Sequence, residues 1–368
     1  MKRKKIIISL LLLILVNMVH SQKIFEVDNF YLKQAKTIIV EPISFFVTDK
    51  DYVFIMDRKA SNIKIYSKKG KFIKVLGRKG VGPNEFLNLL CFTSYKDELL
   101  IYDIRRRALF LYKIDRQLRF MENKKIKFES FITEMQYIDK DKVLMTGEEF
   151  DSFDRKTRKS YTLFVYNVKR KTKKLLLPAT IAYGVKNQKE ANDFFLNTIG
   201  LMPIGSSSSF SQKYFFYVLS TKIRIVRLSK KQNKVFVFGK RSKNFISPYI
   251  SKEIREAIKR RNLNMLNEKV KKMSFVIKLF YIGNNKVGLL FTKYDSLRNR
   301  QDIYIQIYNS INGNIIKEIK LIKTESEYVD DLKAYYKRET KSLYILETVS
   351  AGFSDQKFKL RKFKITDK

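Results

Sequence analysis

Residues 43–86 read ISFFVTDKD YVFIMDRKAS NIKIYSKKG KFIKVLGRKGVGPNEF, and this stretch decides the fold. Each of its four pieces alternates apolar and polar residues and carries turn-forming Asp, Ser or Gly near its end. Alternation with a period of two is typical of a half-buried β-strand, because successive side chains point to opposite faces. Four such strands joined by short turns form a small antiparallel sheet. A sheet of this size cannot bury its own faces, so it needs neighbours of the same kind.

The four-strand pattern recurs along the chain. We expect six units, at about residues 43–86, 87–130, 131–177, 198–239, 274–323 and 329–368. The last unit shows only three strands, and the segment FYLKQAKTIIV at 30–40 can supply the fourth. Closing a ring with strands from both ends of the chain removes an exposed sheet edge. The predicted fold is therefore all-β, a six-bladed β-propeller of four-stranded antiparallel blades.

Two segments depart from the regular pattern. In the fourth unit we expect TIGLMPI (198–204) as the innermost strand and the serine-rich residues 205–212 as a turn. Between the fourth and fifth units, residues 245–273 predict a helical insertion, with Ser247 and Pro248 suited to its first turn. Its basic face, which includes Arg255 and Lys259, either faces water or docks on an acidic partner or an anionic surface.

The first unit also resembles the NHL-like six-bladed propellers of bacteria. These carry an Asp before the turn between the second and third strands, an Asn after it, and a glycine-rich link to the next blade. The matching residues here are Asp57, Asn62, Gly80, Gly82, Pro83, Glu85 and Phe86, with Asp103 in the second unit. Asn84 stands where the family has Gly. The resemblance implies a propeller fold and structural turn and link roles for these residues, and no particular reaction.

The N-terminus has the features of a secretory signal peptide. MKRKK is followed by the apolar run IIISLLLLILV and by small or polar residues, so we expect residues 1–21 to be removed before Gln22. The alternative is an uncleaved anchor. The apolar run is shorter than the ~20 residues that cross a bilayer, and no later segment is apolar enough to do so. We therefore expect an exported protein, periplasmic, at the cell surface or extracellular, without a transmembrane segment after cleavage.

Composition limits the chemistry. The formal net charge of +40 falls to +36 once Lys2, Arg3, Lys4 and Lys5 are removed, and cleavage also removes His20, the one histidine. The mature chain therefore lacks imidazole bases and histidine metal ligands. Cys91 is the one cysteine and lies in an apolar stretch, which favours a packed core residue over a nucleophile. The positive charge either solvates the surface or attracts anionic partners, while export argues against nucleic acid.

The lengths of the connections suggest where a ligand binds. Naming the strands of a blade a to d from the axis outward, the b–c turns and d–a links lie on one face, and they hold nearly all of the long connections. The candidate binding residues on this face are Arg58, Arg78, Arg105, Arg106, Arg107, Arg255 and Lys259. Guanidinium groups there would match carboxylates or phosphates, although such residues also occur in ordinary solvated turns.

These observations favour an exported, monomeric, non-catalytic binding or scaffold module without a cofactor. Its expected partner is an anionic glycan, a cell-envelope polymer or an acidic protein. The alternative is a propeller hydrolase, lactonase or lyase that holds a divalent cation such as Ca²⁺ near the axis with carboxylate and Asn oxygens. The innermost strands begin mostly with apolar or neutral residues, so the sequence assigns no catalytic or metal-ligating residue.

Overall fold

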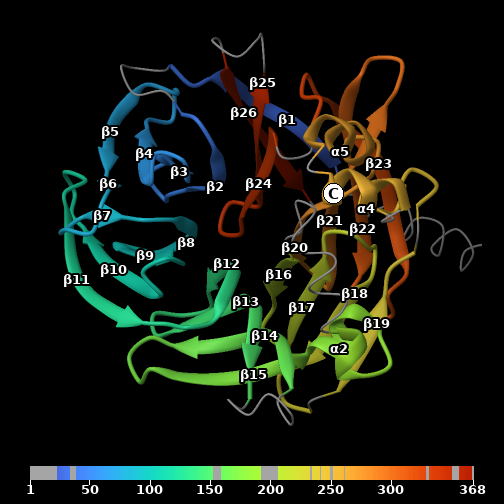
Figure 1. Ribbon diagram of the computed structural model, residues 1–368, viewed down its shortest axis with the longest axis horizontal. Coiled ribbons are helices and arrows are strands. Elements are labelled where there is room, and N and C mark those ends of the chain that lie inside the picture. The colour runs from blue at the N-terminus through green and yellow to red at the C-terminus, as the bar shows by residue number, and fades with distance from the viewer. Residues whose placement is uncertain are drawn as a thin grey trace, which may run out of the picture.

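The computed structural model describes residues 23–33, 39–151, 159–191, 206–232, 234–240, 242–248, 252–260, 262–328, 331–349 and 356–366. These residues form a six-bladed β-propeller, in which four-stranded antiparallel sheets surround a central axis (Figure 1). In each of the first five blades the chain runs outward from strand a to strand d, and the six a strands contact one another in a ring. The predicted fold class is confirmed. The expected signal peptide, residues 1–21, lies outside the described residues.

Each blade is one continuous antiparallel ladder. Blade 1 consists of β2 (Pro42–Val47), β3 (Val53–Asp57), β4 (Asn62–Tyr66) and β5 (Phe72–Leu76). Blade 2 consists of β8 (Leu89–Tyr95), β9 (Glu98–Asp103), β10 (Ala108–Ile114) and β11 (Phe120–Lys127). Blade 3 consists of β12 (Phe131–Tyr137), β13 (Lys142–Phe150), β14 (Ser160–Asn167) and β15 (Thr172–Pro178). Blades 4 and 5 consist of β16 (Ser206–Phe210), β17 (Tyr214–Leu219), β18 (Ile225–Ser229), β19 (Val235–Phe238); and β20 (Val276–Gly283), β21 (Lys286–Asp295), β22 (Arg300–Asn309), β23 (Ile315–Lys323). Blade 6 consists of β24 (Leu332–Lys337), β25 (Ser342–Val349), β26 (Lys357–Thr366) and β1 (Lys23–Tyr31).

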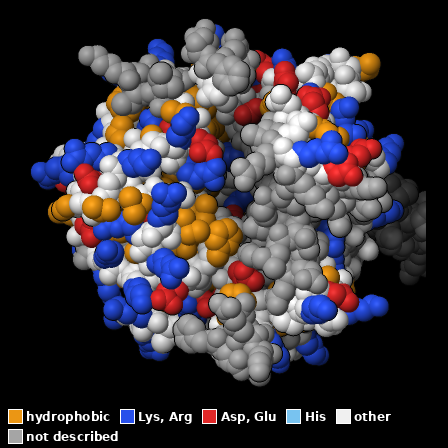
Figure 2. Space-filling model, in the orientation of Figure 1, with side chains coloured by type: hydrophobic (Ala, Val, Ile, Leu, Met, Phe, Trp, Pro, Cys, Tyr) orange, Lys and Arg blue, Asp and Glu red, His pale blue; other side chains and the backbone are white. Residues whose placement is uncertain are grey.

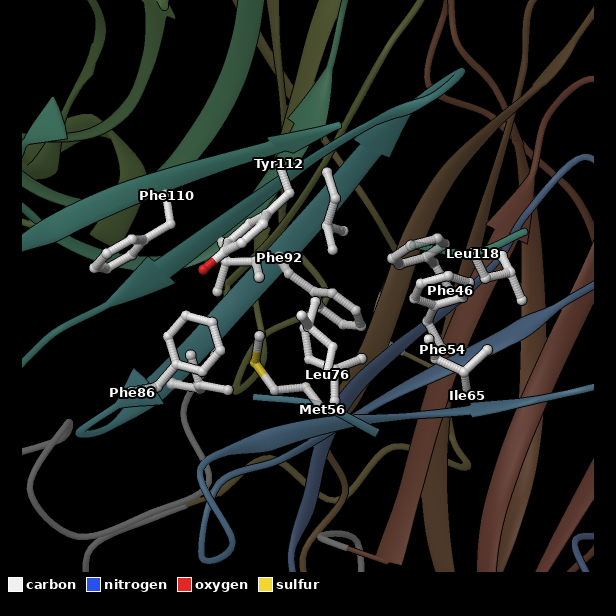
Figure 3. Packing of buried hydrophobic residues seen from close by; sticks show 14 of the residues in the cluster. Phe46, Phe54, Met56, Ile65, Leu76, Phe86, Phe92, Phe110, Tyr112 and Leu118 are labelled. Carbon is white, nitrogen blue, oxygen red and sulfur yellow. The ribbon is translucent and has the colours of Figure 1, made fainter. Parts of the chain in front are cut away.

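Neighbouring blades bury their faces against each other. Between blades 1 and 2, apolar side chains from both sheets form one cluster (Figure 3). Phe46 of blade 1 lies with its ring centroid 4.8 Å from that of Phe92 of blade 2, and the ring of Phe86, from the link between the blades, meets Phe110 edge-on at 5.7 Å. Contacts of this kind supply the neighbours that an isolated four-stranded sheet lacks.

The closing strand begins earlier in the chain than we expected. β1 (Lys23–Tyr31) pairs with β26 from Lys23↔Thr366 to Tyr31↔Lys359, and the two strands lie side by side in Figure 1. The predicted segment, 30–40, overlaps β1 only at Phe30 and Tyr31, so its position was wrong although closure by the N-terminus was right. Ile39 is buried in the core beyond the strand, which explains the apolar signal that misled the prediction.

The innermost strand of blade 4 is the serine-rich segment. β16 pairs with β17 from Ser206↔Leu219 to Phe210↔Phe215, so the expectation of a turn at 205–212 was wrong, and residues 198–204 lie outside the described residues. Serine has a low strand propensity, but here its hydroxyls bond the next blade. The backbone N–H groups of Leu279 and Tyr281 donate to the hydroxyl oxygens of Ser207 and Ser209 at 3.1 and 2.9 Å.

The insertion between blades 4 and 5 contains two short helices, α4 (Lys252–Lys259) and α5 (Leu263–Val270), instead of the one helix that we expected. Asn262 separates them, because its side-chain oxygen accepts the N–H of Met265 at 3.0 Å and so caps α5. Ile254 and Ala257 of α4 are buried. A further short helix, α2 (Ala179–Tyr183), follows β15. No helix among the described residues has the length and apolarity needed to cross a membrane.

Candidate functional site: the axial channel

A channel of about 620 Å³ follows the propeller axis. It is lined by residues from the a strands of all six blades, so every blade contributes to one shared cavity. Its lining begins at Arg58, in the b–c turn of blade 1, and extends to Arg338 and Glu339, in the a–b turn of blade 6. The volume is within the range of about 300–1,000 Å³ that is usual for small-ligand sites.

Basic side chains outnumber acidic ones around this channel. Among the described residues that line it, the charged ones are Arg58, Lys278, Lys333 and Arg338 against Glu134 and Glu339. Lys278 and Glu134 neutralise each other through an ion pair. The second carboxylate oxygen of Glu134 accepts the backbone N–H of Ser208 at 2.7 Å. The Glu134 carboxylate is therefore engaged in joining blades 3, 4 and 5. Of the other charged residues in the lining, Arg58 pairs with Glu41 outside it, and Lys333, Arg338 and Glu339 remain.

Aromatic residues lie near the a–b end of each a strand, and all of them except Tyr281 line the channel. Each a strand has an aromatic residue near the end at which it enters its a–b turn: Phe46, Tyr95, Tyr137, Phe210, Tyr281 and Tyr336. Tyr95 and Tyr137 of neighbouring blades lie with ring centroids 5.6 Å apart. Such rings offer flat apolar surfaces beside polar edges, which suits ligands that have both apolar and polar parts.

Three polar atoms in the channel wall lack a hydrogen-bond partner within the described part of the chain. They are Oε1 of Gln136, the hydroxyl of Tyr137 and the hydroxyl of Ser220. Buried polar atoms in folded proteins are nearly always paired. These atoms have almost no exposed surface, so a ligand in the channel would reach them only after a local rearrangement of the wall.

The predicted arginines of blades 1 and 2 are not brought together at the axis. Arg58 lines the channel and forms an ion pair with Glu41. Arg106 donates to the backbone oxygen of Glu85 at 2.7 Å, and its guanidinium lies over the ring of Phe110 at 4.8 Å. Arg106 thus holds the link to blade 1 instead of forming an anion clamp at the axis.

The other predicted basic residues of the described part, Arg78, Arg105 and Arg107, do not line the channel. Arg105 and Arg107 are exposed in the b–c turn of blade 2 and do not line the cavity. Arg78 donates to the Glu85 carboxylate at 2.7 Å. Arg255 and Lys259 belong to α4, and their side chains lie outside the described part of the structure. A role for these residues in binding stays a prediction.

Asp57 fastens the b–c turn to the start of blade 1. Its carboxylate accepts the N–H groups of Val40 at 2.8 Å and Ala60 at 3.2 Å, and the ammonium of Lys64 at 2.6 Å. Burial alone would raise the pKa of Asp57, but the bonds from Lys64 and the backbone outweigh it, so the pKa lies below its usual range. Asn62 adds a side-chain oxygen to Lys64 at 3.1 Å.

Asp103 makes the equivalent contacts in blade 2. It accepts the N–H groups of Leu87 at 2.7 Å, Asn88 at 3.2 Å and Arg106 at 3.1 Å. Both Asp57 and Asp103 therefore have their oxygens occupied by the chain itself. Carboxylates held in this way shape the backbone and leave little capacity for general acid–base chemistry.

The glycine-rich link folds back on itself between β6 (Arg78–Lys79) and β7 (Glu85–Phe86), which pair in parallel. A side chain at Gly80 would meet the Glu85 carboxylate at 2.1 Å, and Glu85 accepts the N–H of Gly82 at 2.8 Å. Asn84, two residues after Gly82 and next to Pro83, has a φ of +54°, a conformation that Asn tolerates better than most residues. The link is thus a compact anchor that buries Phe86.

Within the described ranges, no group of three or more His, Cys, Asp or Glu side chains is placed to hold a metal ion. Cys91 lines the channel wall but is 3% exposed. Burial, with a smaller contribution from the nearby Glu134, raises the pKa of the Cys91 thiol well above its ordinary value. A thiol that stays protonated at neutral pH is a poor nucleophile.

Residues 7–195 match the family DUF5128, described as "6-bladed beta-propeller". The chain belongs to this family. The match agrees with the six sheets of the structure, while the narrower NHL-like resemblance stays a prediction. No curated protein gives a significant sequence match.

Two solved structures have the same overall fold. A member of the DUF4221 family from Bacteroides vulgatus is 12% identical, with a TM-score of 0.62 over 95% of this chain and 100% of that chain. A protein of Bacteroides fragilis, whose description reads "Putative exported protein", is 11% identical, with a TM-score of 0.54 over 94% of this chain and 95% of that chain. At such identities the likeness shows the fold alone.

The sequence analysis missed the residues at the a–b end of the channel. Arg338, Phe210 and Tyr281 come from three blades and are brought together only by ring closure. One signal was present in the sequence: an aromatic residue recurs near the end of each a strand. That recurrence could have directed attention to the a–b turns.

Proposed function

We propose that this protein is an exported, non-catalytic binding module that holds an anionic ligand in its axial channel. The proposal is carried by the excess of basic over acidic side chains in a cavity to which all six blades contribute. Because the Glu134 carboxylate is engaged by Lys278 and Ser208, Glu339 is the remaining acidic residue among the described lining residues, against Arg58, Lys333 and Arg338. A cavity whose lining carries charge of mainly one sign attracts ions of the opposite sign.

The ligand class that fits best is an acidic glycan or a fragment of a cell-envelope polymer. Tyr95 and Phe210, which line the channel end and are half-buried, can pack against the apolar faces of sugar rings. Export is supported by the signal-like N-terminus and by the description of one structural neighbour as exported. The cation-dependent hydrolase, lactonase or lyase that the sequence left open has no specific observation in its favour.

Basic side chains are also spread over the outside of the molecule. On the face that Figure 2 shows, Lys and Arg side chains are interspersed with acidic ones instead of forming one patch. Such a surface adds a general attraction for polyanions but selects no docking point. The channel is therefore the part of the molecule that can discriminate between anionic ligands.

A plugged channel tests the proposal. Ala334 lines the channel, whereas Leu297 is 97% exposed on a b–c turn. Calorimetric titration of acidic and neutral oligosaccharides should show binding of acidic ones to wild type and to Leu297→Trp, and a loss of about tenfold or more for Ala334→Trp. Ser44→Trp plugs the channel from blade 1 if Ala334→Trp fails to fold. Equal binding by folded plugged and unplugged proteins would refute a channel site.

A further inference from the structure

Arg338 is held at the channel mouth by aromatic rings from two other blades. It belongs to the a–b turn of blade 6, and its guanidinium carbon lies 5.4 Å from the ring centroid of Phe210 and 5.6 Å from that of Tyr281. Arginine stacks favourably on aromatic rings, and the contact fixes a side chain that would otherwise be mobile. The guanidinium of Arg338 is thus positioned beside the cavity that it lines.

The N–H groups of the Arg338 guanidinium are not hydrogen-bonded to any described residue. Among the described residues, neither a hydrogen-bond acceptor nor a carboxylate contacts its guanidinium, which meets only the two rings. A guanidinium carries five N–H donors in its plane, and stacking on its faces leaves these donors free to reach an acceptor. The Arg338 guanidinium can therefore donate two hydrogen bonds to a group that presents two oxygen atoms.

Arg227 provides an internal comparison. It also lies over two aromatic rings, Tyr214 at 4.6 Å and Phe236 at 4.5 Å. Its guanidinium, however, donates to the backbone oxygens of Ser310 and, at 2.7 Å, Ile311 in the neighbouring blade. Arg227 thus has its donors satisfied where the role is structural. Arg338 lies farther from its two rings, at 5.4 and 5.6 Å, and has no such acceptors among the described residues.

A second cation lies near Arg338. The ammonium of Lys230, in the c–d turn of blade 4, is 5.4 Å from the centroid of Phe210 and 4.7 Å from that of Phe215. It has no acceptor in the described part of the chain. Burial lowers the pKa of Lys230, and the nearby Arg338 lowers it further. Lys142 acts in the same direction and Asp139 opposes it. Two cations brought toward one ring repel each other, and a bound anion would relieve that repulsion.

We propose that Arg338 and Lys230 form a receptor for an oxyanion group, a carboxylate, phosphate or sulfate, at the a–b mouth of the axial channel. The proposal rests on the proposed function for the remainder of the ligand, which extends into the channel. A guanidinium fork matches two oxygens of any of these groups, and the ammonium supplies a point charge to a third. The ligand would therefore enter from the face opposite to the one bearing the long b–c and d–a connections.

NMR of arginine side chains tests the receptor directly. The probes are sodium glucuronate, glucose 6-phosphate and glucose 6-sulfate, which differ in the oxyanion, with neutral glucose as the control. In the full mature protein, the Nε–H resonance of Arg338, assigned by its absence from Arg338→Lys, should shift in a saturable manner with at least one acidic sugar. The resonance of Arg227 should stay in place.

Matched variants separate binding from stability. Arg338→Lys keeps the charge and loses the fork, so we expect binding at least about tenfold weaker with an unchanged melting temperature. Arg227→Lys should melt earlier and bind as wild type does. Lys230→Met should also weaken binding. If Arg338→Lys loses affinity for just one of the three acidic sugars, the oxyanion of that sugar is the group that the receptor binds. An Arg338 resonance unmoved by all three acidic sugars, or undiminished binding by Arg338→Lys, would overturn the receptor.

The two proposals fail in different ways. Acidic sugars that bind through Arg338 while Ala334→Trp leaves oligosaccharide binding unchanged would support the receptor and refute the channel. Acidic oligosaccharides that bind wild type but not Ala334→Trp, with no effect of Arg338→Lys, would support the channel and refute the receptor.

Discussion

The ammonium of Lys64 lies 2.6 Å from the carboxylate of Asp57, and both side chains are excluded from solvent, with exposures of 1% and 0%. Removing one member of a buried ion pair leaves the other charge uncompensated. We expect Asp57→Asn to lower the free energy of unfolding by about 3–5 kcal/mol in urea titrations. Glu129→Gln, which removes an exposed ion pair with Lys127, should leave the midpoint nearly unchanged.

The stabilisation by Asp57 should depend on pH with a defined sign. Because the folded-state pKa of Asp57 is lowered, its contribution is complete above the unfolded-state pKa and is lost as the pH falls through the folded-state value. The difference in stability between wild type and Asp57→Asn should therefore shrink in acid. A difference that stays constant from neutral pH to pH of about 2 would contradict the assignment.

The serine strand β16 gives a second prediction. The Ser209 hydroxyl accepts the N–H of Tyr281 at 2.9 Å, and Ser209 is 5% exposed. Ser209→Ala leaves that N–H without its acceptor and should cost about 1–3 kcal/mol. Ser209→Thr keeps the hydroxyl and adds a β-branched carbon that favours strands, so it should unfold at nearly the wild-type urea concentration. Equal stability of all three proteins would show that the hydroxyl is dispensable.

The closing strand gives a third prediction. A protein that begins at Leu32 lacks β1 and exposes the edge of β26, which otherwise pairs along most of its length. Exposed edges pair with other chains, so size-exclusion chromatography should show oligomers or aggregates. A synthetic peptide of residues 23–31 should restore the monomer. A monomeric, stable truncated protein would mean that β1 is not needed for closure.

Anion binding should weaken at alkaline pH. A bound anion favours the charged form of Lys230, whose pKa in the free protein is lowered. Binding therefore falls as the pH rises through that lowered pKa, earlier than for an exposed lysine. Lys230→Arg, which stays charged, should bind glucuronate or glucose 6-phosphate with little change over the same pH range. A wild-type profile as flat as that of the variant would exclude a role for Lys230.

The sequence was sufficient for the fold because strand periodicity is local. The alternation in residues 43–86 and its recurrence predicted the number of blades and closure by the N-terminus. The position of the closing strand was missed because KIFEVDNFY (23–31) and the apolar residues near Ile39 both carry a strand-like signal. Only pairing with β26 distinguishes them.

The serine strand shows where propensity fails. Four consecutive serines, at 206–209, are typical of a turn, but the hydroxyls of Ser207 and Ser209 accept backbone N–H groups from β20 of the adjacent blade. That bond depends on the position of another blade and has no local signature. The division of the insertion into α4 and α5 was easier to predict from the sequence, since Asn is a frequent helix-capping residue and stands at position 262.

The candidate site could not be predicted from the sequence, because the chain has many basic residues. Arg338 is one of 76 Lys and Arg residues, and nothing next to it in the chain marks it. Its distinction is that it contacts Phe210 and Tyr281, which lie far away in sequence, and that its donors are unspent. The arginines chosen from the turn motifs, such as Arg106, are instead engaged by the chain itself.

The most direct measurement is an anomalous difference map from crystals of the mature protein soaked in sodium selenate, an oxyanion that resembles sulfate. We expect a strong peak within hydrogen-bond distance of the Arg338 guanidinium, at the mouth of the axial channel, and its loss in Arg338→Met. A map without a peak in the channel, or with equal peaks at scattered surface lysines, would contradict it.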